Sequence, residues 1–323
     1  LLESLVGFAD FGDGLSLEPG RPLSLVIEGP MAAGLAAEDD NLILRAARLF
    51  AEAYPVSQSG RFHLVKRLPV ASGIGGGSSD AAAALRLLAR LNGIPPNDPP
   101  LVTIARALGA DVPVCLEAQP RLMRGIGHEL GPALAFEAEP ALLVNPGVAV
   151  ETRAVFSAIG LKPGQRFVPP VRGIEPGPSF ARETRNDLEA PALALAPEIG
   201  EVPAALRGEP GCRVARMSGS GATSFALFDT EAAATAAASW QRRNTDVAAT
   251  IRHRTTAEPA YSRASASVGA SPASTLPPGN SHIPSKWEPA FRRDRSTRPS
   301  SMRTPATTST VCMARACTSP FAR

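Results

Sequence analysis

Apolar and polar residues recur along much of the chain with the two periods that mark strands and helices. Asn41–Tyr54 carries apolar residues at helical spacing, and Asp40 or Asn41 is placed to cap that helix. Leu23–Gly29 alternates like a strand, and Phe62–Pro69 reads as a second strand. This mixture predicts a fold of helices and sheets.

The later segments continue the same mixture. Helices are predicted over Ser79–Leu91, Leu101–Gly109 (ended by Gly109), Arg185–Leu206 (with proline breaks) and Glu231–Gln241. Strands are predicted at Ala141–Gly147, on both sides of the Gly/Ser turn in Cys212–Phe228, and at a closing edge, Val247–Arg252. Asn92–Pro100 reads as a turn, and the Pro- and Gly-rich stretch Leu161–Pro178 could join two domains.

The last 69 residues, 255–323, differ from everything before them. Ser, Thr and Pro supply 30 of them, and no apolar periodicity is present. Such a segment cannot bury enough apolar surface to offset ~1–2 kcal/mol of backbone entropy per residue, so we predict disorder. A basic interaction arm and the product of an altered reading frame are the alternatives.

The net charge of +3 comes from this tail. Residues 255–323 hold 9 Lys and Arg against 3 Asp and Glu, which leaves 24 basic and 27 acidic residues in 1–254. The body therefore shows no nucleic-acid footprint. No apolar run approaches the ~20 residues of a membrane span, and no signal peptide is recognised.

The cysteines and histidines point to no metal or redox chemistry. The four cysteines are too scattered for a disulfide scaffold, which favours a reducing cytoplasm, and Cys115 and Cys212 are expected to pack as small hydrophobes. His63 and His128 have no carboxylate and nucleophile patterned around them. We therefore predict neither a histidine-based hydrolase nor a metal site with protein ligands.

The run SGIGGGSSD, Ser72–Asp80, is the strongest local signal for function. It lies between a predicted strand and a predicted helix, an arrangement that aims backbone N–H groups and the positive end of a helix dipole at an anion. Ser78 and Ser79 are placed to cap the helix, and their hydroxyls are placed to face a phosphate or Mg²⁺. Spacing excludes the Walker and Rossmann patterns. A flexible linker or a structural turn is the alternative to a phosphate loop.

Four segments, in order, resemble motifs of the GHMP kinase superfamily, which includes galactokinase, homoserine kinase and mevalonate kinase. Three glycines, two serines and Asp-Ala-Ala in the second motif are similar to the branch that phosphorylates a cytidine diphosphate-linked methylerythritol in the non-mevalonate route to isoprenoid precursors. The segments are Leu68–Leu85 (second motif), Leu108–Leu116 (Gly-Ala-Asp-Val-Pro), Asn186–Glu189 (Asn-Asp-Leu-Glu) and Met217–Phe228 (third motif). The resemblance spans residues 1–252.

The resemblance implies an α+β, two-domain GHMP kinase fold with the active site between the domains. Residues 1–147 would form a ribosomal-S5-like N-terminal domain, incomplete at its start, and 148–254 a ferredoxin-like α/β sandwich, followed by the 255–323 tail. About 25–30 residues are expected upstream, carrying a lysine that pairs with the catalytic aspartate and a cytidine-binding stretch. The alternatives are a catalytically impaired nucleotide-binding remnant and a kinase for another small alcohol.

The resemblance also implies roles for particular residues. Asp111 would be the general base that accepts the proton of the substrate hydroxyl, although an Asp before Val-Pro is otherwise a turn or helix cap. The implied ligands are ATP with Mg²⁺ and the cytidine diphosphate-linked substrate, without nucleic acid or membrane, in a monomer or homodimer. The ATP-binding residues would be Pro69, Val70, Ala71, Ser72, Gly73, Ile74, Gly75, Gly76, Gly77, Ser78 and Ser79.

Three further sites keep two interpretations each. Lys66 is either near the nucleotide or a solvated lysine at a strand end. The turn Ser218–Gly221 either is a structural hairpin or helps shape the phosphate site. Asn186 and Asp187 either cap a helix or belong to the family's Asn-Asp-Leu-Glu segment.

Overall fold

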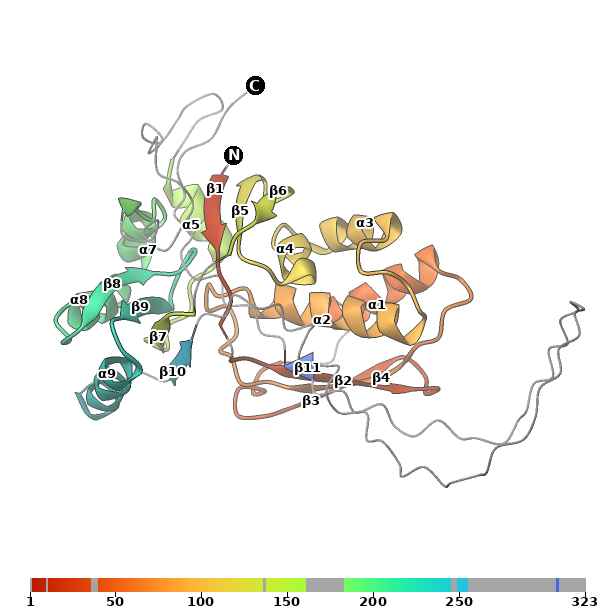
Figure 1. The fold of residues 1–323 in the computed structure, drawn as a ribbon, viewed down its shortest axis with the longest axis horizontal. Helices are drawn as coiled ribbons and strands as arrows, with labels where there is room; N and C mark the ends of the chain where they lie inside the picture. The colour runs from red at the N-terminus through yellow and green to blue at the C-terminus, as the bar shows by residue number, and fades with distance from the viewer. Residues whose placement is uncertain are drawn as a thin grey trace, which may run out of the picture.

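The computed structural model describes residues 2–9, 11–35, 40–135, 138–160, 183–244, 249–254 and 306–307 (Figure 1). The predicted linker 161–178 lies outside these residues, and so does the tail apart from Ala306–Thr307. Those two residues form β11, which pairs with β2 at Leu15 and Gly14.

The first sheet has the strand order β11-β2-β4-β3, with β2 (Gly14–Pro19), β3 (Ser24–Glu28) and β4 (Gly60–Val65). β4 pairs antiparallel with β2 and parallel with β3. Burial alternates along β4, so that Phe62 and Leu64 face the core, as the period of a strand requires. This strand leads directly into the glycine run.

Four helices cover one face of this sheet (Figure 1). They are α1 (Leu42–Ala53), α2 (Gly76–Leu91), α3 (Pro99–Leu108) and α4 (Val112–Glu117). Phe50 of α1 and Leu85 of α2 are fully buried in the shared core. Each such side chain contributes ~1.5–3 kcal/mol relative to an exposed position.

The second sheet has the order β10-β7-β9-β8 and is antiparallel at each of its pairings. Its strands are β7 (Pro140–Asn145), β8 (Cys212–Met217), β9 (Ser224–Phe228) and β10 (Ala249–Arg254). Leu142 and Val144 pack with α8 (Glu201–Arg207) and α9 (Glu231–Asn244), whereas Leu143 faces the opposite side.

That opposite side packs against the glycine run. Leu68 and Ile74 are fully buried in one apolar cluster with Leu143 and Phe225. The second sheet therefore supports the loop that follows the first sheet. The remaining elements are β1 (Leu2–Val6), β5 (Arg121–Gly125) and β6 (Glu129–Ala133), which form a third sheet, with α5 (Thr152–Ala158), α7 (Glu189–Leu195) and η1 (Pro197–Gly200).

Most of the predicted elements that fall on described residues are confirmed. The side chain of Asn41 caps α1 by accepting the Ile43 amide at 2.9 Å, and β10 is an edge strand. The predicted serine cap of α2 is wrong. The helix begins at Gly76, and its N-cap is Gly75, whose φ of +69° glycine adopts readily.

Within the described residues, no helix is long and apolar enough to cross a membrane. Over the same residues, no group of three or more His, Cys, Asp or Glu side chains is arranged to hold a metal ion.

Candidate functional site

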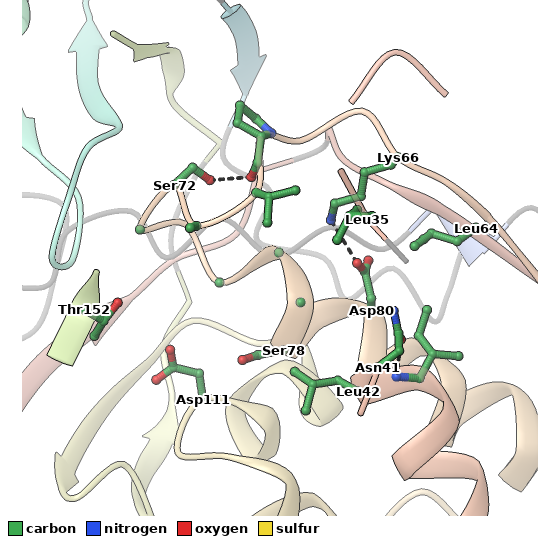
Figure 2. Close-up of a pocket in the computed structure, with 18 of the residues that line it drawn as sticks. Leu35, Asn41, Leu42, Leu64, Lys66, Ser72, Ser78, Asp80, Asp111 and Thr152 are labelled. Carbon is green, nitrogen blue, oxygen red and sulfur yellow. Dashed lines mark hydrogen bonds and ion pairs between the residues drawn. The ribbon is translucent and has the colours of Figure 1, made fainter. Parts of the chain in front are cut away.

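A pocket of about 410 Å³ lies at the glycine run, between the two main sheets (Figure 2). Its lining includes the apolar residues Leu35, Leu42, Ile43, Leu64 and Val70. Hydroxyl and charged groups come from Lys66, Ser72, Ser78, Asp80, Asp111, Thr152 and Ser220. This combination suits a ligand that has both an apolar ring and polar, charged groups.

The glycine run forms a loop that ends on the first turn of α2. Gly75 starts the helix, and the Ser79 amide donates to the Gly75 carbonyl at 2.9 Å. Helix geometry leaves the amides of Gly76, Gly77 and Ser78 without an acceptor inside the helix, and these three residues line the pocket. The positive end of a 16-residue helix therefore points at the cavity.

The third-motif turn packs directly on this loop. Ser218 Oγ donates to the Gly73 carbonyl at 3.3 Å, and the Thr223 amide donates to the Ser72 carbonyl at 3.1 Å. A Cβ on Gly73 would come within 2.1 Å of the Gly221 carbonyl oxygen. The turn is thus more than a hairpin, because it holds the loop from the side of the second sheet.

Asp111 immediately precedes α4 and lines the pocket. Its side chain makes no capping hydrogen bond to the helix that it precedes. In Figure 2 its carboxylate lies below the glycine loop, near Thr152 and Ser78. The structure thus places the predicted base beside the predicted phosphate loop, where a substrate hydroxyl and a phosphate could meet.

Two hydroxyls from the second half of the chain complete this side of the pocket. Thr152 Oγ1 and Ser220 Oγ lie 2.9 Å apart, and both residues line the cavity. Behind them, Asn145 Nδ2 donates to Thr223 Oγ1 at 2.8 Å. The polar end of the site is therefore built from the start of α5 and from the third-motif turn.

A buried ionic cluster lies on the other side of the loop. Lys66 Nζ donates to Asp80 Oδ2 at 3.0 Å and also to Asp13 Oδ2, and all three side chains are buried. Lys66 is therefore not a solvated strand-end lysine. Burial works to lower its pKa, but the carboxylates of Asp80 and Asp13 outweigh that effect and raise the pKa.

The pKa of the Asp80 carboxyl is raised well above its ordinary value. Burial raises the pKa of Asp80 to about 7, and the charge of Asp13 adds to the rise while the Lys66 ammonium opposes it. One ammonium shared by two buried carboxylates leaves an excess of one negative charge when both acids are ionised. A raised pKa on one of them is the expected response.

Asn186 braces the third-motif turn and bonds the chain just before α7, but the predicted helix cap is wrong, because the N-cap of α7 is Leu188 and no side chain caps the helix. Its Nδ2 donates to the carbonyls of Met217 and Gly219 at 3.0 and 2.8 Å, and its Oδ1 accepts the Leu188 amide at 3.0 Å. The Asp187 carboxylate pairs instead with Arg185 at 2.6 Å. The Asn-Asp-Leu-Glu segment therefore supports the site from behind.

The residues predicted to bind ATP divide into two groups. Those at the cavity wall are Pro69, Val70, Ala71, Ser72, Gly73, Gly75, Gly76, Gly77 and Ser78. Ile74 and Ser79 are fully buried and lie outside the wall, Ile74 in the apolar cluster beneath the loop. Cys115 is buried in the core, and Cys212 is half-buried.

Sequence reasoning gave no role to Asp13, Asp80 or Thr152. Asp13 lies in Phe-Gly-Asp-Gly, which looks like an ordinary turn. Asp80 was noted only as part of the second motif and was given no role of its own. A carboxylate that is buried beside a lysine 53 residues away leaves no local signal in the sequence. The sequence offers one hint, the Lys66-Arg67 pair between a strand and the glycine run.

Comparison with known families places the chain among kinases. The family model described as GHMP kinases N terminal domain matches residues 41–119, and the one described as GHMP kinases C terminal matches residues 175–246. Together they contain the glycine loop, Asp111 and the third-motif turn.

Curated relatives and a solved structure support the same family. The chain is 56% identical over 246 residues to the 4-diphosphocytidyl-2-C-methyl-D-erythritol kinase of Methylobacterium radiotolerans, covering 74% of this chain and 84% of the relative. It is 54% identical over 238 residues to that of Xanthobacter autotrophicus, covering 71% and 81%.

A crystal structure of 4-(cytidine 5'-diphospho)-2C-methyl-D-erythritol kinase superposes with a TM-score of 0.57 at 31% identity, over 78% of this chain and 98% of that chain. Mevalonate kinase of L. major, at 16% identity and a TM-score of 0.55, shares the fold, over 80% and 96% of the two chains.

Proposed function

The chain belongs to the 4-diphosphocytidyl-2-C-methyl-D-erythritol kinase family of GHMP kinases, and we propose that it phosphorylates a hydroxyl of that compound with ATP at the pocket under the glycine loop. It is an ATP-dependent kinase by this membership. The observation that carries the proposed site is one cavity lined both by the helix start Gly76–Ser78 and by Asp111. The reaction would serve the non-mevalonate route to isoprenoid precursors.

Each wall of the pocket has a role in this proposal. The apolar residues around Leu42 and Ile43 receive the nucleobase, and the amides at the start of α2 receive the phosphates. Ser72 and Gly73, held by the third-motif turn, fix the loop that surrounds them. Phosphoryl transfer depends mainly on such positioning and on neutralising the charge of the moving group.

Asp111 acts as the general base. Its carboxylate accepts the proton of the substrate hydroxyl as the oxygen forms a bond to the γ-phosphorus. The bond from that phosphorus to the bridging oxygen of ADP breaks, and ADP leaves with the electron pair. The hydroxyls of Thr152 and Ser220 lie in the same wall and orient the accepting end of the substrate.

We propose that Mg²⁺ enters with ATP. Magnesium in such sites is held by one or two carboxylates together with substrate phosphates. The pocket wall fits this ion because it offers oxygen donors, the carboxylate of Asp111 and the hydroxyl of Ser78. The ion would supply positive charge around the phosphates.

We further propose two domains that meet near residue 147, a cytoplasmic location, and a monomer or homodimer without nucleic-acid or membrane partners. The first main sheet takes β2, β3 and β4 from well before this point, and the second sheet begins with β7 (Pro140–Asn145), just before it, which supports a division close to residue 147. The acidic balance of residues 1–254 supports the absence of a nucleic-acid partner.

The test is ADP release by the full chain with Mg²⁺-ATP and 4-diphosphocytidyl-2-C-methyl-D-erythritol, mevalonate or homoserine as acceptor. We expect turnover with the first compound alone. ATP affinity is measured separately by calorimetry. Binding of ATP without transfer would identify an impaired nucleotide-binding remnant, and preference for another alcohol would overturn the proposed substrate.

A further inference from the structure

The mechanism above makes no use of the buried Lys66, Asp13 and Asp80, which we call the anchor cluster. Asp13 lies in the loop before β2, Lys66 directly follows β4, and Asp80 is the fifth residue of α2. Burying charges is costly even when they are paired, so a buried ion pair is weak evidence of stabilisation by itself. The position of the cluster in the fold indicates what it does.

The cluster holds the chain where it enters the glycine loop. Asp13 Oδ1 accepts the amides of Arg67 and Leu68 at 2.6 and 2.9 Å, directly before Pro69. Its other oxygen accepts a hydrogen bond from Lys66 Nζ. Both oxygens of one carboxylate therefore fix the backbone and the side chain that lead into the loop.

The same cluster holds the chain where it leaves the loop. Lys66 Nζ donates to Asp80, the fifth residue of α2, as Figure 2 shows. A Cβ on Gly76 would lie 3.4 Å from Lys66 Nζ and 3.7 Å from Asp13 Oδ2, so the cluster lies directly beneath the start of the helix. Entry and exit of the loop are thus tied to one ammonium group.

We infer that Lys66, Asp13 and Asp80 act together as positioning residues that set the first turn of α2 at the angle at which its amides bind the phosphates of ATP. The inference rests on the proposed binding of ATP in this pocket. Breaking the cluster should weaken ATP binding more than it slows the transfer step, because none of the three carries out the proton transfer assigned to Asp111.

The protonation of Asp80 gives a second way to test the inference, through the pH dependence of ATP binding. In the described part of the chain, the charged groups that shift the pKa of Asp80 are Lys66 from the end of β4 and Asp13 from the loop before β2. Asp111, which precedes α4, also lines the pocket, and α1 contributes the neutral Asn41. ATP brings negative charge to this wall, so it should bind more tightly when Asp80 carries its proton.

The experiment compares three variants of the full chain with wild type. Asp80→Ala removes one of the two acceptors of Lys66, the one on α2. Asp80→Asn keeps that acceptor without a charge, and Glu52→Ala changes an exposed carboxylate on α1 as a matched control. The dissociation constant for ATP is measured by calorimetry from pH 6 to 8, and the KM for ATP and kcat by ADP release.

We expect Asp80→Ala to raise the dissociation constant and the KM for ATP about tenfold, with a smaller change in kcat. Asp80→Asn should recover most of the affinity, and Glu52→Ala should match wild type. Between pH 6 and 8, wild-type affinity should fall by a larger factor than that of Asp80→Asn, since the titration of ATP itself is common to both.

Two results would overturn the inference. One is ATP affinity in folded Asp80→Ala equal to that of Glu52→Ala. The other, which applies even if Asp80→Ala does not fold, is the same pH dependence in wild type and in Asp80→Asn. Failure of the proposed function is a separate outcome, because it would appear in wild type itself, either as no binding of ATP or as binding of ATP without transfer.

Discussion

The Thr223 amide donates a hydrogen bond to the Ser72 carbonyl, at 3.1 Å, and so joins the third-motif turn to the glycine loop across 151 positions of sequence. With the anchor cluster on the other side, the loop is held from both main sheets. Such support is what a phosphate site needs, because its amides bind well only when their direction is fixed in advance.

The contact between Gly73 and the third-motif turn leaves no room for a side chain. Gly73→Ala should lower the free energy of unfolding by roughly 1–3 kcal/mol and weaken ATP binding, since its Cβ would meet the Gly221 carbonyl at a φ of +73°. Gly20→Ala is the matched control, with a φ of +74° and nothing within 4 Å. It should cost only about 1 kcal/mol of conformational strain and leave ATP binding unchanged. Equal losses in the two variants, by denaturant unfolding, would argue against the contact.

Asn186 allows its two structural roles to be separated. Asn186→Ala should cost about 1–3 kcal/mol, because the carbonyls of Met217 and Gly219 lose their donor. Asn186→Asp retains an acceptor for the Leu188 amide but places a carboxylate against those two carbonyls. It should therefore be at least as destabilising as alanine in thermal unfolding. If aspartate is tolerated, the bond to the Leu188 amide matters and the brace does not.

Asp80 predicts a pH dependence of stability with a definite sign. Its pKa is about 7 in the folded protein and 3.8 as an ordinary aspartate, so the folded state binds more protons between these values. The contribution of Asp80 to the free energy of unfolding therefore falls as pH rises from about 4 to about 7, and levels off above that.

Asp80→Asn removes this titration. Denaturant unfolding of both proteins across pH 4 to 8 should show wild type losing stability relative to the variant as pH rises. A difference that is flat, or that grows in favour of wild type with rising pH, would contradict the raised pKa.

The elements that could be predicted from the sequence are those with a local signal. The helix at Leu42–Ala53 and the glycine loop followed from periodicity and from the strand and helix around the glycines. The strands β5 and β6 were missed, because Arg121–Gly125 and Glu129–Ala133 do not alternate and contain Gly and Pro. The six-residue α4 was missed because Asp-Val-Pro reads as a turn.

The residues of the candidate site also separate into those with a local sequence signal and those without one. Asp111 and the glycine loop were recognisable as motifs, and they meet in one pocket. The partnership of Lys66 with Asp13 depends on β2 and β4 pairing in one register, which no local pattern encodes. Thr152 reaches the pocket only because α5 starts there, and a lone threonine carries no signal of that kind.

The proposed chemistry rests on Asp111, and its amide variant tests it most directly. ADP formation is measured with Mg²⁺-ATP and 4-diphosphocytidyl-2-C-methyl-D-erythritol for wild type and Asp111→Asn, with ATP affinity measured in parallel. We predict wild-type turnover, a loss in kcat of roughly 10²–10⁴-fold in the variant, and an ATP dissociation constant within about threefold of wild type. Full turnover by Asp111→Asn would contradict the account.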